Sequence, residues 1–344
     1  MMTKIRAFRL DINRAFRLLA IVVCLLLLGQ TALATDPTFK LDFDGDGKTD
    51  IAMYRKGFLN TDQSYWRYIK SSDGTTVVQT PWGLGEDYPV PGDYNNDGIS
   101  DRTIFRPSTG NTYFINEGLP SFRASYFGIT SSFKMARRYF SFFGTTQVSE
   151  LRLQNVSEDP ESPFFVWYYF IQTSDEGFYG RDTGVASAPP YSKQLPAPGD
   201  YDGNGFSDIG VFDYVTNHFH YWPGPDFDVD HDVALTLVRY PAPGDYDGDG
   251  KTDIAGYYIA SDLRLIWRYI ESSTGITREV HWGTNGDMPV PGDYDGDNKT
   301  DFAVFRPSDT TWYILKSSNG QIIYQQFGTA QDIPLASAVL YNGF

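Results

Sequence analysis

Cysteine is nearly absent from this chain of 344 residues, and histidine and basic side chains are scarce. There is one cysteine, Cys24, there are four histidines, and 28 lysines and arginines face 43 aspartates and glutamates. A single cysteine leaves no pair for an internal disulfide, so rigidity must come from another source. The formal net charge of −15 argues against a nucleic-acid binder and against electrostatic docking on an anionic membrane, because both need a basic surface.

Long apolar runs are also missing, apart from Leu18–Leu28 near the N-terminus. Several basic residues precede this run, and the small residues Ala32 and Ala34 follow it, which is the order of a secretory signal. The run is shorter than the roughly 20 apolar residues of a membrane-spanning helix. We therefore expect residues 1–34 to be a signal peptide, cleaved after Ala34, and the mature chain to be secreted without a membrane span or a cysteine. An uncleaved signal anchor is the alternative.

An acidic segment with the pattern D-x-[DN]-x-[DN]-G-x-x-D recurs at intervals of about 50 residues, a period typical of repeat architectures. Its copies are Asp42–Asp50, Asp93–Asp101, Asp200–Asp208, Asp245–Asp253 and Asp293–Asp301. The gap between the second and third copies is twice as long as the others, which indicates a repeat that has lost the motif. In that repeat Tyr139–Gly144 stands where the acidic loop belongs, and Glu150–Leu153 stands where the following strand belongs.

Short runs rich in aromatic and β-branched residues follow the acidic segments, and turn residues separate them. Examples are Ile51–Arg55, Tyr65–Ile69 and the run that ends at Trp82–Gly83, while Ser317–Gly320 indicates a hairpin turn. Beyond the first 34 residues no stretch has helical periodicity. Four strands in each repeat of about 40 to 50 residues are typical of propeller blades.

The sequence therefore predicts an all-β protein in which residues 35–344 form a single β-propeller of four-stranded blades. Six repeats fit, so six blades are favoured and seven are the alternative. The segment Ile333–Ala336 begins a further copy, and we expect it to complete the first blade. An array of separate domains is disfavoured because a lone blade of this length cannot bury both of its faces.

The acidic loop has the composition of a calcium site. Oxygens at positions 1, 3 and 5 of a tight turn can face one centre, glycine at position 6 allows a left-handed backbone, and a carbonyl at position 7 and an aspartate at position 9 complete the set. In the last copy Asn298 replaces the glycine, and asparagine tolerates the same conformation. About five Ca²⁺ sites follow. The predicted side-chain ligands are Asp42, Asp44, Asp46 and Asp50; Asp93, Asn95, Asp97 and Asp101; Asp200, Asp202, Asn204 and Asp208; Asp245, Asp247, Asp249 and Asp253; and Asp293, Asp295, Asp297 and Asp301, with the carbonyls of Lys48, Ile99, Phe206, Lys251 and Lys299.

The acidic loop followed by an apolar strand such as Phe302–Arg306, repeated at this period, resembles the FG-GAP and VCBS-type repeats, which are related to the propeller of integrin α-chains. The resemblance covers about residues 39–344 and fails at the third repeat. It implies an integrin-like propeller with Ca²⁺ in the loops between the first two strands of a blade. It also implies a secreted or surface protein that serves in adhesion or in binding a glycan or protein ligand. Fold alone does not decide function within such a family.

A secreted polysaccharide-active enzyme, a lyase or hydrolase on a calcium-stabilised propeller, is the alternative, and a purely structural repeat is a third possibility. No G-x-S-x-G, P-loop or H-E-x-x-H motif occurs, so no catalytic residue is assigned and a non-enzymatic role is favoured. His218 and His220, with His231 downstream, permit a transition-metal site, although a polar strand face is the main interpretation. Aromatic residues mostly indicate packing; the candidates for a sugar platform are Tyr168, Tyr169, Trp222 and Tyr258.

Overall fold

The structure of the protein is a computed structural model. It describes residues 40–93, 97–115, 122–126, 135–136, 148–155, 165–172, 178–187, 194–205, 208–223 and 230–336. The chain divides into two units, Met1–Thr35 and Asp36–Phe344, and every described residue belongs to the second. The predicted signal peptide at residues 1–34 and the segment Tyr139–Gly144 therefore lie outside the described residues.

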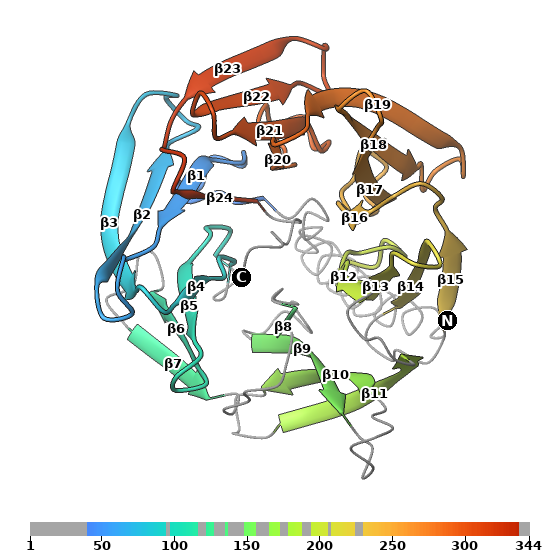
Figure 1. The fold of residues 1–344 in the computed structure, drawn as a ribbon, viewed down its shortest axis with the longest axis horizontal. Helices are drawn as coiled ribbons and strands as arrows, with labels where there is room; N and C mark the ends of the chain where they lie inside the picture. Colours follow the sequence, from blue (N-terminus) through green and yellow to red (C-terminus); the bar gives the residue numbers. More distant parts are fainter. Residues whose placement is uncertain are drawn as a thin grey trace, which may run out of the picture. The chain divides into compact units, whose positions relative to one another are not determined.

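The described residues contain strands and no helix, as the sequence predicts, and they form four-stranded antiparallel sheets (Figure 1). In order within each sheet, the strands are β24 (Ile333–Leu335), β1 (Ile51–Arg55), β2 (Gln63–Ile69) and β3 (Val77–Leu84); β4 (Tyr88–Pro89), β5 (Arg102–Arg106), β6 (Asn111–Ile115) and β7 (Phe122–Tyr126); β8 (Met135–Ala136), β9 (Val148–Asn155), β10 (Phe165–Gln172) and β11 (Phe178–Ser187); β12 (Gln194–Pro196), β13 (Ile209–Asp213), β14 (His218–Trp222) and β15 (His231–Ala234); β16 (Tyr240–Pro241), β17 (Ile254–Ile259), β18 (Arg264–Ile270) and β19 (Thr277–Thr284); and β20 (Met288–Pro289), β21 (Phe302–Arg306), β22 (Thr311–Leu315) and β23 (Ile322–Gln326). Within the described residues, no helix has the length and the apolar character of a membrane span.

Burial changes across each sheet in the way that the sequence pattern predicts. The strand that follows an acidic loop is a short apolar run; in β21, for example, Phe302, Ala303, Val304 and Phe305 are all buried. The last strand of the same sheet, β23, alternates between half-buried and exposed side chains. A strand covered on both faces needs a continuous apolar run, whereas a strand with one solvated face alternates.

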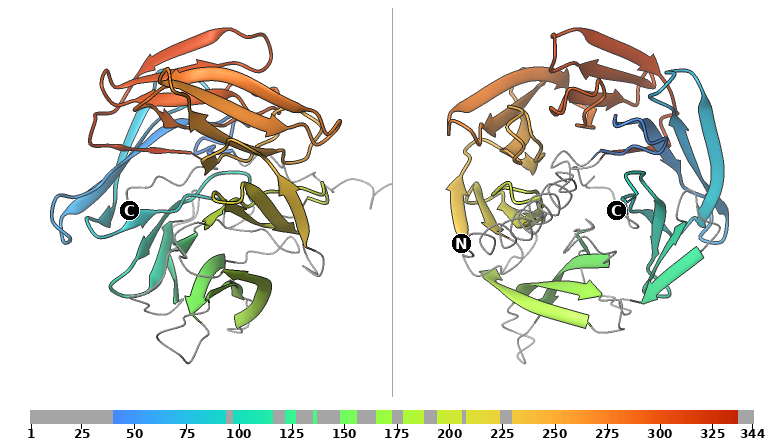
Figure 2. Two further views of the ribbon diagram at one scale, coloured as in Figure 1. Left: turned by 45° about the vertical axis from the view of Figure 1, so that its right-hand side comes forward. Right: turned by 180° about the vertical axis from the view of Figure 1, so that it is seen from behind.

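The C-terminal strand supplies the fourth strand of the first sheet. β24 pairs antiparallel with β1, with Tyr54 opposite Ile333, Met53 opposite Pro334 and Ala52 opposite Leu335. Figure 2 shows β24, in red, beside β1, in blue, in the view from behind. This pairing confirms the expectation that the segment beginning at Ile333 completes the first sheet.

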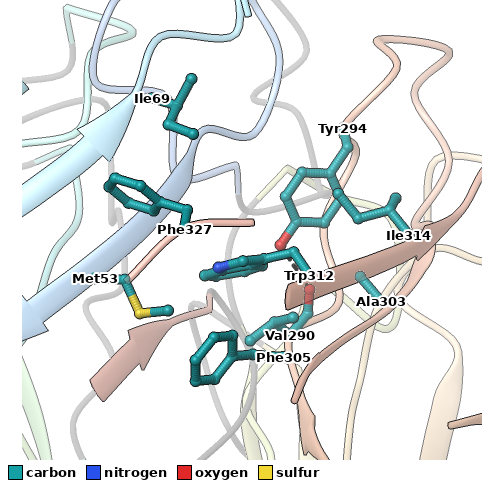
Figure 3. Packing of buried hydrophobic residues seen from close by; sticks show 9 residues of the cluster. All are labelled: Met53, Ile69, Val290, Tyr294, Ala303, Phe305, Trp312, Ile314 and Phe327. Atoms are coloured by element: carbon teal, nitrogen blue, oxygen red, sulfur yellow. Dashed lines mark hydrogen bonds between the residues drawn. The ribbon is translucent and has the colours of Figure 1, made fainter. Parts of the chain in front are cut away.

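Aromatic and aliphatic side chains fill the space between neighbouring sheets. One cluster joins Met53 of β1 and Ile69 of β2 to Trp312 and Phe305 of the sheet β20–β23 (Figure 3). Trp312 and Phe305 have no exposed surface, and their ring centroids lie 5.7 Å apart. Large aromatic rings bury 150–250 Å² each on general grounds, so such clusters contribute much of the stability.

The third repeat also forms a four-stranded sheet, β8–β11, in a region that lacks the acidic motif. Glu150–Leu153 lies within β9, as its position after the missing loop predicts. The acidic motif is therefore not required for a repeat to fold as a sheet.

Candidate metal centre

The acidic loops connect the first two strands of their sheets or, for the first copy, precede β1. Copies 93–101, 200–208, 245–253 and 293–301 lie between β4 and β5, β12 and β13, β16 and β17, and β20 and β21. Each of these four loops closes on a β-bridge between the glycine before the motif and the aspartate at position 9, as in Gly244 with Asp253. The two ends of the motif are thus held together at the base of the loop.

The aspartate at position 1 holds the turn together from inside. Asp245 Oδ1 accepts a hydrogen bond from the backbone N–H of Gly248 at 2.6 Å, and its Oδ2 accepts from Gly250 at 2.9 Å. Both glycines have positive φ, 80° and 87°. Asn298 takes the same conformation with φ of 65°, and its N–H donates to Asp293 at 2.9 Å. The expected tolerance of asparagine at position 6 is confirmed.

The aspartate at position 9 is completely buried and bonded to backbone. Asp253 has no exposed surface; its Oδ2 accepts from the N–H of Tyr246 at 2.8 Å and its Oδ1 accepts from the N–H of Ser272 at 2.7 Å. Burial disfavours the charged form and raises the pKa of Asp253 to about 7 despite these two bonds. The pKa values of Asp50 and Asp301 are raised to about 7 for the same reason.

Four of the five predicted loops bring three carboxylates together, with oxygens within 4.8 Å of one another. The groups are Asp42, Asp44 and Asp50; Asp200, Asp202 and Asp208; Asp245, Asp247 and Asp253; and Asp293, Asp295 and Asp297. In the first three groups the acids come from positions 1, 3 and 9, and in the last from positions 1, 3 and 5.

The aspartates at position 5 bond the backbone of their own loop, including Asp297, which accepts from the N–H of Lys299 at 2.9 Å. At position 5, Asp249 Oδ1 accepts from the N–H of Lys251 at 2.9 Å; Asp46 and the backbone of Lys48 are joined in the same way at 3.0 Å. Asp46 and Asp249 are absent from the three-carboxylate groups, and so is Asp301. Asn95 and Phe206 lie outside the described residues, and Asp93, Asp97 and Asp101 form no such group among the described ones. The carbonyl ligands at Lys48, Ile99, Lys251 and Lys299 remain predictions.

Paired serines in a neighbouring turn were not identified as part of the site from the sequence. Ser272 Oγ donates to Asp249 Oδ1 at 2.9 Å, and Ser273 Oγ donates to Asp247 Oδ2 at 2.6 Å. The turn between β18 and β19 therefore contacts the carboxylates at positions 3, 5 and 9. A Ser-Ser-x-Gly sequence recurs in three repeats and could have pointed to these serines. From the sequence it was interpreted only as a hairpin turn.

Two buried carboxylate oxygens test whether a cation fits these loops. Asp44 Oδ1 and Asp295 Oδ1 are buried and have no hydrogen-bond partner, while the other oxygen of each accepts from a serine hydroxyl. A buried charged oxygen without a donor is costly, and a cation beside it removes that cost. The described donors are all oxygens, which suits a hard cation such as Ca²⁺. The residues therefore fit a calcium ion.

The two neighbouring histidines lie on a strand surface and are paired with carboxylates. His218 Nδ1 lies 2.5 Å from Asp232 Oδ1, and His220 Nδ1 lies 3.4 Å from Asp230 Oδ1. The ring of His231 instead stacks on Tyr221, with centroids 4.7 Å apart. This arrangement supports the interpretation of a polar strand face.

Of the four candidate sugar-platform residues, Trp222 is only 4% exposed, so it is a core residue, as the main interpretation of packing has it, and not a sugar platform. Tyr258 is half-buried. Tyr168 and Tyr169 belong to β10, and their side chains lie outside the described set. The two candidates whose side chains are described, Trp222 and Tyr258, do not form an exposed platform.

Neither a protein-family model nor a curated protein matches this sequence. Among solved structures, the chain is similar to an Agrocybe aegerita lectin that recognises non-reducing terminal N-acetylglucosamine, with 11% identity, a TM-score of 0.46, and coverage of 84% of this chain and 92% of the lectin. It is also similar to virginiamycin B lyase from Staphylococcus aureus, with 11% identity, a TM-score of 0.39, and coverage of 83% and 86%. At these values neither similarity carries an inference about a ligand or a reaction.

Proposed function

We propose that the chain is a secreted, calcium-binding repeat protein of the FG-GAP/VCBS type, built as a six-bladed, integrin-like propeller. In this proposal calcium occupies the acidic loops and holds them in shape, and the scaffold acts as a non-enzymatic module that binds a glycan or protein outside the cell. The observation that carries the calcium proposal is the group of three facing carboxylates that recurs in four loops. Two of these groups contain a buried carboxylate oxygen without a hydrogen-bond donor.

Electrostatics supports a metal in these loops over a purely hydrogen-bonded turn. The carboxylates at positions 1 and 9 are at most 5% exposed in the four grouped loops, and desolvation raises the pKa of several, to about 6 for Asp245. Facing carboxylates in a desolvated loop repel one another unless a cation or protons neutralise them. Extracellular calcium supplies that charge in a secreted protein that has no disulfide.

The enzyme alternative receives no specific support from the described residues. The histidines that could act as acid or base are half-exposed on a strand and paired with exposed aspartates. The carboxylates with raised pKa values all belong to the acidic loops. Perturbed groups gathered in metal loops favour a structural role over proton transfer.

The calcium proposal is tested by thermal unfolding of the mature chain in EGTA, in Ca²⁺ and in Mg²⁺. A site that binds only the folded state contributes about 2.7 kcal/mol when free Ca²⁺ is 100 times its Kd, so several sites raise the melting temperature by many degrees. Mg²⁺ should have a much smaller effect because it demands a compact octahedral geometry. The same melting curve in EGTA and in Ca²⁺ would refute the proposal.

The binding role is tested separately on a glycan array with Ca²⁺ and with EGTA. Binding that requires Ca²⁺ supports a glycan-binding module. Absence of binding in Ca²⁺ leaves a protein ligand, which a pull-down with the calcium-loaded mature chain then addresses.

A further inference from the structure

We propose that the paired serines after the second strand of three repeats are positioning residues for calcium, and that they divide the acidic loops into two affinity classes. The pairs are Ser71–Ser72, Ser272–Ser273 and Ser317–Ser318. Loops Asp42–Asp50, Asp245–Asp253 and Asp293–Asp301 have such a pair and form the tight class. Loops Asp93–Asp101 and Asp200–Asp208 form the weak class. This inference rests on the proposed calcium function.

The first serine of each pair joins positions 5 and 9 of its loop. In the first sheet the N–H of Ser71 donates to Asp50 Oδ1 at 2.7 Å, and its hydroxyl donates to Asp46 Oδ1 at 2.8 Å. The corresponding distances are 2.7 and 2.9 Å for Ser272, and 2.7 and 2.9 Å for Ser317. The same two contacts therefore recur in three separate repeats.

The second serine holds the aspartate at position 3. The hydroxyl of Ser72 donates to Asp44 Oδ2 at 2.6 Å, and Ser273 and Ser318 make the same bond to their loops at 2.6 and 2.5 Å. The bond fixes one carboxylate oxygen and thereby sets the direction of the other. In Asp44 that other oxygen, Oδ1, is the buried atom that lacks a donor, and the same holds for Asp295. In these two loops the serine thus turns the free oxygen of position 3 into the loop, whereas in the third loop Asp247 Oδ1 accepts from the N–H of Asp249 at 3.1 Å.

The energetic benefit is pre-organisation. In the first loop Asp44 at position 3 is half-buried and Asp46 at position 5 is exposed, and the two repel each other, so without a partner each samples several rotamers. A hydroxyl that holds one oxygen lowers the entropy lost when calcium binds the other. Partners of this kind outside the ligand set typically change metal affinity by about 10- to 100-fold.

The other two repeats have no hydroxyl at the corresponding positions, counted from the end of the second strand. There the sequence has Glu117-Gly118 after β6 and Gly224-Pro225 after β14. In the loop at 200–208, the side-chain amide of Asn204 donates to Asp202 Oδ2 at 2.9 Å. Position 5 of this loop thus has an amide in place of a carboxylate, and fewer charged ligands lower calcium affinity.

The test measures calcium binding by isothermal titration on the mature chain and on three variants of one turn. In wild-type protein we expect three tight sites and a weaker class. Ser273→Ala should weaken one of the three tight sites by about 10- to 100-fold, and Ser273→Thr, which keeps the hydroxyl, should restore it. Thr274→Ala is the matched control, since the Thr274 hydroxyl donates to Glu271 in the same turn and not to the loop.

The outcomes separate this inference from the calcium function itself. Calcium binding by wild type with no change in Ser273→Ala overturns the serine proposal and leaves the function standing, whereas no calcium binding by wild type overturns both. Circular dichroism and urea unfolding in EGTA show whether Ser273→Ala remains folded. If it does not, Ser318→Ala gives the same measurement in the adjacent sheet. Equal weakening by Thr274→Ala would also contradict a positioning role.

Discussion

Lys40 links the first acidic loop to the last, and its removal should destabilise the calcium-free protein more than the calcium-loaded one. Its Nζ donates to the Gly47 carbonyl at 2.8 Å, to Asp293 Oδ2 at 2.9 Å and to Asn298 Oδ1 at 3.0 Å. The Lys40 side chain is 12% exposed and the Asp293 side chain is fully buried. Lys40→Met keeps the aliphatic length and removes the charge.

The magnitude follows from what Lys40→Met leaves behind. Without calcium, Asp293 remains buried with no cation, and breaking a buried ion pair typically costs about 3–5 kcal/mol. Because Lys40 retains some exposure, we expect a loss near the lower end, about 3 kcal/mol. With calcium in the last loop, Asp293 keeps a cation, and what is lost is the ammonium's two hydrogen bonds to the uncharged oxygens of Gly47 and Asn298, worth about 1–2 kcal/mol.

The assay is urea unfolding of wild type and Lys40→Met, each in EGTA and in saturating Ca²⁺. Lys299→Met is the matched control, since the Lys299 ammonium also reaches a neighbouring loop but donates to a carbonyl, that of Asp247, at 2.6 Å. The control should lose about 1 kcal/mol in both conditions. An equal loss for Lys40→Met in EGTA and in Ca²⁺ would refute the view that Asp293 depends on Lys40 for its counter-charge.

Three further changes test other parts of the fold. Gly244→Ala would place a Cβ 2.7 Å from Thr300 Oγ1 in the next loop, so urea unfolding should show a loss of about 1–3 kcal/mol from overpacking. Arg306→Ala leaves Asp287, whose side chain is 1% exposed, without its two bonds of 2.7 and 2.8 Å, and should cost about 2–4 kcal/mol in the same assay. In EGTA the melting temperature should be higher at pH 5 than at pH 7.5: burial raises the pKa of Asp253 to about 7, so the folded state binds its proton more tightly than the unfolded state, and this stabilisation is lost as pH rises from about 4 to 7. Saturating Ca²⁺ should reverse that pH trend, because protons then compete with the metal.

The sequence predicted the parts of the fold that depend on local and periodic patterns. The alternation of apolar runs with turn residues located the strands, for example Ile51–Arg55, because a strand buried on both faces requires such a run. The five copies in register located the acidic loops, because left-handed glycines and carboxylates at fixed spacing leave few other structures. Ile333 was recognised as the start of a new copy, and the pairing of β24 with β1 follows from that.

The errors and omissions concern contacts between residues that are far apart in sequence. Trp222 was a candidate for an exposed platform, yet it is buried, because its exposure depends on neighbouring sheets and not on its own strand. The contacts of Asp249 with the N–H of Lys251 and with the Ser272 hydroxyl were not predicted, and its role as a metal ligand stays a prediction. The serine lies 23 residues further along the chain, in a turn whose sequence is explained equally well by hairpin geometry alone.

Position 8 of the acidic motif shows most clearly why a repeat must be considered together with its neighbour. Every copy has serine or threonine there, which the motif leaves as an arbitrary residue. The Thr252 hydroxyl accepts from the N–H of Asp200 at 2.9 Å, and the N–H of Thr252 donates to the Asp200 carbonyl at 2.7 Å, so this side chain is explained by the preceding acidic loop. The N–H at position 8 makes the corresponding bond from Thr300 to Asp245, from Thr49 to Asp293 and from Ser100 to Asp42. In these four pairs one loop therefore supports position 1 of its neighbour, and the hydroxyl contacts of Thr252 with Asp200 and of Ser100 with Asp42 explain a small polar residue at a position that the metal chemistry alone leaves free.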